Sequence, residues 1–202
     1  MARPKNQAAR RGELVRAAKA AIAERGLTGL RAIDVAERAG LSAGSVAYYY
    51  PELDDLVREV HRDAVARFTW QRLGEHPDAL GARERLARLI RSGIPASRGD
   101  VDFQVLNELH THAARDEYHA GLMAELFRLE VELYTATLEA GMCAGEFSLR
   151  LPVATAASNL VALEDAYGLH YLGGTPLERD EVYGLIASCA EVLTGCSLPP
   201  IS

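Results

Sequence analysis

The chain of 202 residues is 49% hydrophobic and 25% charged, which is typical of a globular protein of one or two domains with a substantial core. No apolar run approaches the roughly 18 residues that a membrane-spanning helix needs, and no apolar signal segment follows the basic start MARPKNQAARRG. Three cysteines are an odd number in a chain of this size, so we expect reduced thiols and a cytoplasmic protein.

The charge is unevenly distributed. Residues 1–50 hold nine Lys and Arg against four acids, a net charge of +5, so the remainder carries −11 of the chain's total of −6. A basic region on an acidic body concentrates the attraction for a polyanion at one end of the chain. Chance alone produces such an asymmetry on some solvated surfaces, so it supports a nucleic-acid partner without establishing one.

The periodicity predicts an all-α protein of about nine helices. Segments such as ERGLTG, GEHPDALG and LGGTP separate stretches in which apolar residues recur every three or four positions. One stripe comprises Leu14, Ala18, Ala21 and Ile22, and a second comprises Val182, Leu185, Ile186, Cys189, Val192 and Leu193. We predict an N-terminal three-helix head over 1–52 and a larger helical bundle over 53–202, which begins with a long helix from about Pro51 to Arg72.

Residues 31–50 fit two short helices that meet at a sharp turn. Ala36 is small enough for a close helix crossing, and Gly40, four residues later, can adopt the left-handed conformation of a tight helix exit. Ser42 is a good N-cap for the next helix. The apolar wedge between the helices is assigned to Ile33, Val35, Leu41 and Val46. This spacing is typical of a helix-turn-helix, although small-residue corners also occur in ordinary helical bundles.

The second of these helices, residues 43–49, is then the recognition helix. Its small residues Ala43, Gly44 and Ser45 permit close approach of the helix N-terminus to DNA. Tyr48 and Tyr49 can donate hydroxyls to phosphates, whereas Tyr50 is expected to pack internally. The alternative is that all three tyrosines close the seam with the next helix. Adjacent helical residues cannot all face one core, which favours DNA contact for Tyr48 and Tyr49.

The segment LTGLRAIDVAERAGLSAGSVAYYYPELDDLVREV resembles the DNA-binding region of the TetR family of bacterial transcription regulators. The resemblance covers about sixty residues and includes Gly26, Ile33, Val35, Ala36, Ala39 to Ser42, Gly44, Val46, Tyr49, Tyr50 and Leu56. It implies a homodimer whose heads bind a palindromic operator and whose body binds a small ligand, without a cofactor. Two positions depart from the family, which usually has Tyr at Ala47 and Lys at Leu53 for backbone contacts.

These departures shift the expected phosphate contacts to other side chains. The candidates are Tyr48, Tyr49, the basic N-terminal arm and Arg31, which replaces the usual Thr cap of the preceding helix. The arm either reaches an adjacent groove or is a frayed end. The predicted DNA-binding residues are Lys5, Arg10, Arg31, Ser42, Ala43, Gly44, Ser45, Tyr48 and Tyr49.

The resemblance places the dimer interface on the helices near 151–172 and 179–195, although their composition also fits an ordinary core. The middle helices, near 82–92, 101–114 and 118–140, are expected to surround the ligand site. Apolar walls with a few directed polar groups are typical of small-molecule sites. The predicted ligand-binding residues are Phe103, Asn107, His110, Phe127, Tyr134, Glu164 and Tyr167, with ordinary core or surface roles as the alternative.

The rival hypothesis is a small helical metal-dependent hydrolase or hydratase that uses Glu108, His110 and His112. The chain has no HExxH or CxxC motif, no nucleophile elbow, no P-loop and no dinucleotide fingerprint, so we expect no metal site and no catalysis. A helical adaptor whose head binds protein is a third possibility.

Overall fold

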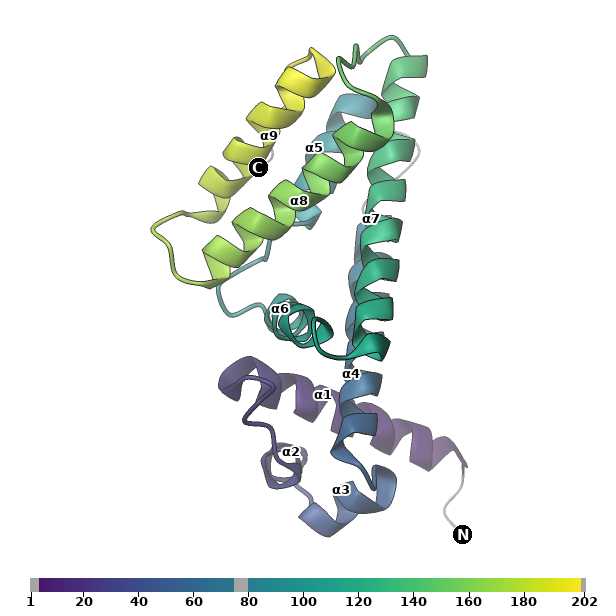
Figure 1. Ribbon diagram of the computed structural model, residues 1–202, viewed down its shortest axis with the longest axis vertical. Helices are drawn as coiled ribbons and strands as arrows, with labels where there is room; N and C mark the ends of the chain where they lie inside the picture. The colour runs from purple at the N-terminus through teal and green to yellow at the C-terminus, as the bar shows by residue number, and fades with distance from the viewer. Residues whose placement is uncertain (1–3, 75–79, 201–202) are drawn as a thin grey trace. The chain divides into compact units, whose positions relative to one another are not determined.

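The computed structural model describes residues 4–74 and 80–200 (Figure 1). These residues form nine α-helices and no strand, which confirms the all-α prediction. The helices are α1 (Pro4–Arg25), α2 (Ala32–Ala39), α3 (Ala43–Tyr49), α4 (Leu53–Gly74), α5 (Ala82–Ser92), α6 (Val101–Ala113), α7 (Glu117–Cys143), α8 (Val153–Leu172) and α9 (Arg179–Thr194). In the described part of the chain, no helix combines the length and the apolar character that crossing a membrane requires.

The helices form two compact units. The first comprises residues up to 67 together with 101–123, and the second comprises residues 68–100 together with those from 124 onward. Both α4 and α7 contribute residues to each unit. The first unit extends beyond the predicted head of residues 1–52, because α6 packs against α1. The functional division at residue 52 stays a prediction.

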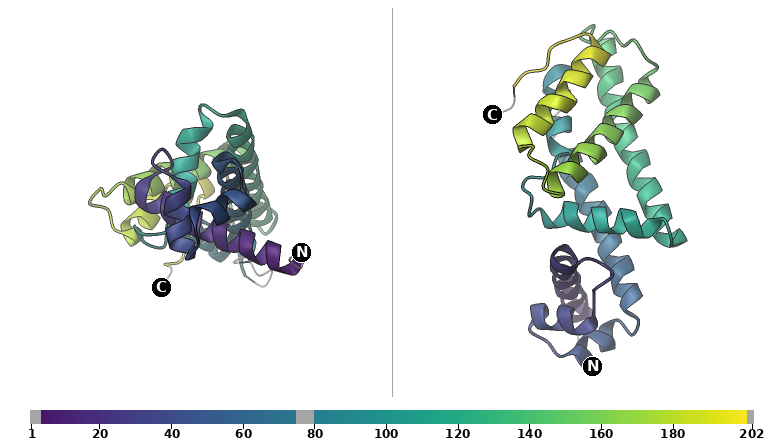
Figure 2. Two further views of the ribbon diagram at one scale, coloured as in Figure 1. Left: turned by 90° about the horizontal axis from the view of Figure 1, so that it is seen from below. Right: turned by 60° about the vertical axis from the view of Figure 1, so that its left-hand side comes forward.

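The first unit is organised around α1, which packs against α2 and α6 (Figure 2). The predicted stripe on α1, Leu14 with Ala18, Ala21 and Ile22, is fully buried. Lys19, on the same helix, is also buried, and its ammonium lies 2.7 Å from Asp63 of α4 and 2.6 Å from Asp102 of α6. Two carboxylates therefore neutralise a buried charge at the point where three helices meet.

The turn between α2 and α3 has the predicted geometry. Gly40 adopts the left-handed conformation, with φ 64° and ψ 36°, and the N–H of Leu41 donates to the carbonyl of Ala36 at 2.9 Å. Ser42 begins α3, and its hydroxyl accepts from the N–H of Ser45 at 3.2 Å. The predicted wedge was wrong in one member, because Ile33 is 42% exposed on the outer side of α2.

In the second unit α8 and α9 lie side by side, and α5 packs against α9 (Figures 1 and 2). The core contains Leu86, Leu89, Ile90, Tyr134, Leu138, Leu160, Val161, Val182 and Ile186. The predicted stripe on α9 divides between two environments: Val182 and Ile186 are buried, whereas Leu185, Cys189 and Val192 are exposed. The α9 stripe therefore includes apolar residues that the core of the second unit does not cover.

Candidate functional site

The outer face of α3 is accessible and its N-terminus is capped. The Ser42 hydroxyl caps the helix and also lies 2.9 Å from the hydroxyl of Ser45. Val46, which is 1% exposed, packs α3 against the rest of the first unit. Gly44, on the outer side of α3, is exposed. A short helix with small residues at its N-terminus and one buried anchor is suited to enter a DNA groove.

The three tyrosines have different environments. Tyr48 is 74% exposed, Tyr49 is half-buried, and Tyr50 is 3% exposed. The rings of Tyr48 and Tyr49 contact each other edge to face, with centroids 5.2 Å apart. Tyr50 donates its hydroxyl to Glu59 at 2.7 Å, and burial, with that carboxylate, raises its pKa well above the usual value. The predicted internal packing of Tyr50 is confirmed.

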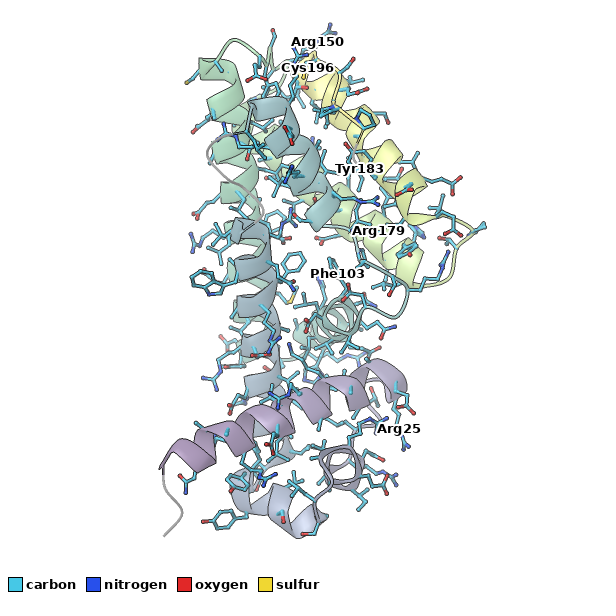
Figure 3. All side chains as sticks on the ribbon, turned by 180° about the vertical axis from the view of Figure 1, so that it is seen from behind. Arg25, Phe103, Arg150, Arg179, Tyr183 and Cys196 are labelled. Carbon is cyan, nitrogen blue, oxygen red and sulfur yellow. The ribbon has the colours of Figure 1, made fainter. Side chains whose placement is uncertain are left out.

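Arg31 and Arg25 converge on Asp34, whose side chain is buried. Arg31 donates from Nε and Nη2 at 3.1 Å each, and Arg25, labelled in Figure 3 at the end of α1, donates at 2.8 Å. The hydrogen bonds from Arg31 are the main cause that lowers the pKa of Asp34. The Arg31 side chain is still 68% exposed. The guanidinium is thus held in one orientation at the surface.

The basic arm belongs to α1, which begins at Pro4. Arg10 pairs with Glu13 on the same helix, whereas the side chain of Lys5 lies outside the described residues. Arg11 donates to the carbonyl of Tyr49 at 3.2 Å. This contact with the end of α3 depends on tertiary packing and could not be inferred from the sequence.

The predicted ligand-binding residues are divided between the two units. Phe103, which Figure 3 labels on α6, belongs to the first unit with Asn107 and His110, and His110 is exposed. The second unit holds Phe127, Tyr134, Glu164 and Tyr167. Within that unit the structure brings Tyr134 and Glu164 into direct contact, since the tyrosine hydroxyl donates to the carboxylate.

That contact belongs to a buried polar cluster centred on Arg72. The guanidinium, 1% exposed, donates to Glu130 at 3.0 Å and to the two oxygens of Glu164 at 2.9 and 3.2 Å. It also lies over the rings of Phe68 and Tyr134, at 5.2 and 5.7 Å from their centroids. The buried Arg72 guanidinium is therefore stabilised by two carboxyl groups, by their hydrogen bonds and by two aromatic rings.

The cluster holds two carboxyl groups and one guanidinium. Burial raises the pKa of Glu130 to about 8, although Arg72 opposes this shift, and burial also raises the pKa of Glu164. The backbone of Gly93 packs closely against Glu164. A Cβ atom built on Gly93 would lie 2.1 Å from the Glu164 carboxyl carbon, so only glycine leaves room for this buried group. The cluster is balanced only when one carboxyl group binds a proton or a second cation.

Sequence reasoning missed Arg72 and Glu130. A signal exists for Arg72, because Val60, Ala64, Phe68 and Arg72 are four residues apart and the first three are buried. A charged residue that continues a buried helical stripe predicts a buried partner. For Glu130 the sequence offers no comparable indication.

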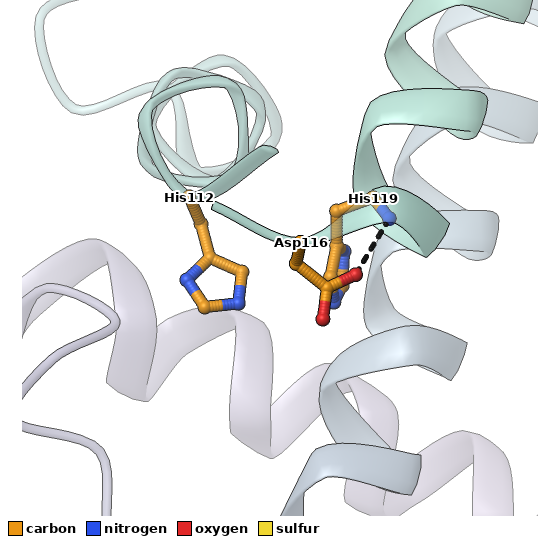
Figure 4. A group of neighbouring side chains, drawn as sticks. All are labelled: His112, Asp116 and His119. Carbon is orange, nitrogen blue, oxygen red and sulfur yellow. Dashed lines mark hydrogen bonds between the residues drawn. The ribbon is translucent and has the colours of Figure 1, made fainter. Parts of the chain in front are cut away.

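The residues of the enzyme hypothesis are not brought together. Glu108 accepts from the backbone N–H of Leu27 at 2.9 Å, and the exposed His110 lies on another side of α6. His112 instead lies beside Asp116 and His119 (Figure 4). The predicted set of Glu108, His110 and His112 was therefore wrong as a single site.

An apolar groove lies on the outer face of α8 and α9. Val192 is 71% exposed and Leu185 is 39% exposed. The groove is lined by Asn159, Ala162, Leu163, Ser188, Cys189, Val192 and Leu193. A contiguous apolar surface of this kind is typical of a protein–protein interface.

A capped, exposed helix after a tight glycine turn is the geometry of a helix-turn-helix, and comparison with known proteins identifies the class to which it belongs. Residues 14–60 match the bacterial regulatory proteins of the tetR family. The chain is 32% identical over 177 residues to the HTH-type transcriptional regulator BetI of Burkholderia ambifaria, covering 84% of this chain and 86% of that one. BetI of Burkholderia mallei is 33% identical, with 84% and 85% covered.

Solved structures share the fold. A transcriptional regulator from Saccharomonospora viridis in complex with choline superposes with a TM-score of 0.83 at 23% identity, over 90% of this chain and 95% of that one. A TetR-family regulator from Rhodococcus sp. gives 0.79 at 24%, over 91% and 98%. The chain belongs to the TetR family of bacterial regulatory proteins. It is therefore a DNA-binding transcriptional regulator, and the enzyme hypothesis is not favoured.

Proposed function

We propose that the protein is a homodimeric repressor that releases a palindromic operator when a small cationic ligand binds. The observation that carries the DNA-binding part is α3, whose capped N-terminus and outer face are accessible while Val46 and Tyr50 anchor its inner face. Such a regulator acts where the chromosome is, in the cytoplasm.

On DNA, the N-terminal residues of α3 would meet base edges, with Tyr48 and Tyr49 directed at phosphates. Tyr48 supports this role because its ring is largely exposed. The other proposed contacts come from Ser42, Ala43, Gly44, Ser45, Arg31, Arg10 and Lys5. The functional head remains residues 1–52, with the rest of the chain serving ligand binding and dimerisation.

Two copies are needed because a palindromic site presents two half-sites about one helical turn apart. The exposed apolar groove on α8 and α9 supports an interface there, because Val192 and Leu185 are unfavourably exposed in a lone chain. A two-fold interface of α8 and α9 would form a four-helix bundle with the partner's helices.

The ligand is proposed to be a small cation of the quaternary ammonium class. The related regulator from Saccharomonospora viridis binds choline. In this chain Glu130 and Glu164 offer one more carboxyl group than Arg72 balances, so a ligand cation would take the place of the proton that Glu130 otherwise holds. Tyr134 presents a ring beside them. Carboxylates and aromatic faces together recognise quaternary ammonium groups. The remaining predicted residues, Phe103, Asn107, His110, Phe127 and Tyr167, stay candidates for the pocket.

The effect of ligand binding would be transmitted to the head along α4. This helix begins at Leu53, directly after the proposed head, and carries Arg72 near its other end. Coupling between the two sites is reciprocal, so operator DNA must weaken ligand binding by the factor by which ligand weakens DNA binding.

The test uses duplexes that the purified protein selects from a random library. Choline is then titrated into the complex, with 3,3-dimethylbutan-1-ol, which has the same shape without the charge, as the control. Release by choline alone is expected. Equal release by both compounds, or by neither, would refute a cationic ligand of this class.

A further inference from the structure

The first unit contains a polar cluster, separate from the Arg72 cluster of the second unit, that DNA binding does not explain. His112 lies in the last turn of α6, Asp116 directly precedes α7, and His119 lies in the first turn of α7 (Figure 4). One potential ligand atom from each lies within 4.8 Å of the others. The imidazole of His119 is fully buried, whereas His112 and Asp116 are half-buried.

A chain of contacts determines which nitrogen of His119 carries its proton. The Nε2 of His61, on α4, lies 3.3 Å from the sulfur of Met123. A thioether only accepts, so this nitrogen of a neutral His61 carries the proton and its Nδ1 presents a lone pair. The Nδ1 of His119 lies 2.8 Å from the Nδ1 of His61. Because the His61 nitrogen accepts, the His119 nitrogen must be the donor.

This arrangement leaves the Nε2 of His119 as an unprotonated acceptor. The atom is buried and has no hydrogen-bond partner among the residues that the structure describes. A buried acceptor without a donor is costly, and an imidazole lone pair is also the group that coordinates a metal ion. The pattern is typical of metal-ligating histidines, whose second ring nitrogen donates to a neighbouring acceptor that fixes the tautomer.

Asp116 supplies the negative charge beside the imidazoles. Its Oδ1 accepts from the backbone N–H of His119 at 3.0 Å, which holds the carboxylate at the start of α7. The rings of His112 and His119 lie edge to face, with their centroids 5.0 Å apart at 74°. Two imidazoles and one carboxylate suit a borderline ion and not Mg²⁺ or Ca²⁺, which prefer oxygen ligands.

We propose that His112, Asp116 and His119 bind a divalent transition-metal ion such as Zn²⁺, with His61 as the positioning residue behind His119. Bond lengths of about 2.1 Å place tetrahedral ligands about 3.4 Å apart, so the side chains close by roughly 1 Å around the ion. His112 and Asp116, being half-buried, make this movement and leave the fourth position to water.

The ion would join the end of α6 to the start of α7, with His61 extending the connection to α4. All of these residues belong to the first unit, which also carries α3. Binding only to the folded chain stabilises it in proportion to the logarithm of ion concentration. The site is distinct from the proposed ligand site, and its test does not depend on DNA binding or on choline.

The test uses the full chain without a histidine tag, stripped with a chelator and titrated with Zn²⁺ against a chromophoric chelator. We expect about one ion per chain with micromolar or tighter affinity. His112→Gln and Asp116→Asn should each weaken binding by about tenfold or more, as should His61→Gln, since second-shell changes typically cost 10–100-fold. His170→Gln is the matched control, because this exposed histidine lies on α8 in the second unit, and it should leave the affinity unchanged.

Circular dichroism of each variant establishes that the helices are retained, and Co²⁺ provides a spectroscopic check of tetrahedral coordination. Absence of Zn²⁺ binding by the wild-type chain at about 100 µM, well above the micromolar affinities of functional sites, would overturn the proposal. Binding that His112→Gln and Asp116→Asn leave unchanged would equally overturn it, since the ion would then lie elsewhere.

Discussion

The hydroxyl of Tyr50 lies 2.7 Å from the carboxylate of Glu59 and donates to it, which fixes the end of the recognition helix to α4. Arg11 reinforces the same point, because its guanidinium lies 4.8 Å from the centre of the Tyr50 ring and 3.3 Å from Glu59. Three segments of the first unit therefore meet at one buried tyrosine.

Tyr50→Phe should destabilise the protein by about 1.5 kcal/mol, the value of a hydrogen bond to a charged group, because the ring is retained while Glu59 keeps Arg11 and loses the shorter of its two hydrogen bonds. Tyr48→Phe serves as the control, since the Tyr48 ring is largely exposed and the change should alter stability by less than about 0.5 kcal/mol. Urea unfolding followed by circular dichroism measures both. Equal effects would show that Tyr50 contributes only its ring.

Arg72→Met should destabilise the protein by about 3–5 kcal/mol, because it leaves the carboxyl groups of Glu130 and Glu164 buried without the guanidinium that binds them. The matched control is Arg128→Met. Arg128 pairs with Glu125 and Glu132 on the surface of α7 and is about half exposed, so its loss should cost about 1 kcal/mol or less. Thermal unfolding measures the difference, and similar midpoints for the two variants would contradict the account of the cluster.

The raised pKa of Glu130 predicts a dependence of stability on pH. Its carboxyl group has a pKa of about 8 in the folded chain and about 4.3 when unfolded. Between these values the folded state holds a proton that the unfolded state has released, so this group makes the free energy of unfolding fall as pH rises from about 5 to 8. The slope is at most about 1.4 kcal/mol per pH unit.

Glu130→Gln removes this titration and should flatten the pH profile relative to the wild type. Glu132→Gln, at an exposed position two residues away, should preserve it. Urea unfolding at a series of pH values compares the three proteins. A profile for Glu130→Gln that parallels the wild type would mean that Glu130 is ionised in the folded chain.

Val192→Asp should convert the proposed dimer to a monomer, because it places a charge in the apolar groove of α8 and α9. Val101→Asp is the control: Val101 is also exposed, at the start of α6, where an acidic residue suits the helix dipole. Sedimentation velocity gives the mass of each. A wild-type monomer, or an unchanged dimer in Val192→Asp, would remove α8 and α9 as the interface.

Local chemistry made the helix-turn-helix predictable. Gly40, Ser42 and Val46 act within a few residues of one another, so the left-handed turn, the cap and the buried anchor could all be inferred from spacing. Ile33 shows the limit, because an apolar residue on a short helix can face either neighbour or solvent.

The polar clusters could not be predicted in the same way. Arg72, Glu130 and Glu164 lie on three helices and come together only through packing, as do His61 and His119. The α9 stripe was predicted as a stripe, but the sequence could not show that Val182 is buried within the chain while Val192 is exposed. Apolar periodicity predicts that a helix has an apolar face, but it does not show whether that face packs against the same chain or remains exposed.

The most direct test of the central claim is the affinity of the full chain for a selected duplex as a function of salt concentration. We expect a palindromic consensus and a steep loss of affinity, about 10³-fold or more between 50 and 200 mM salt for a dimer with six or more phosphate contacts. Tyr48→Phe should weaken binding by about tenfold, as expected for a lost hydrogen bond to a charged group, whereas Tyr118→Phe, an exposed tyrosine on α7, should not. No enrichment of any duplex, or an affinity that salt and Tyr48→Phe leave unchanged, would contradict α3 as the DNA-reading helix.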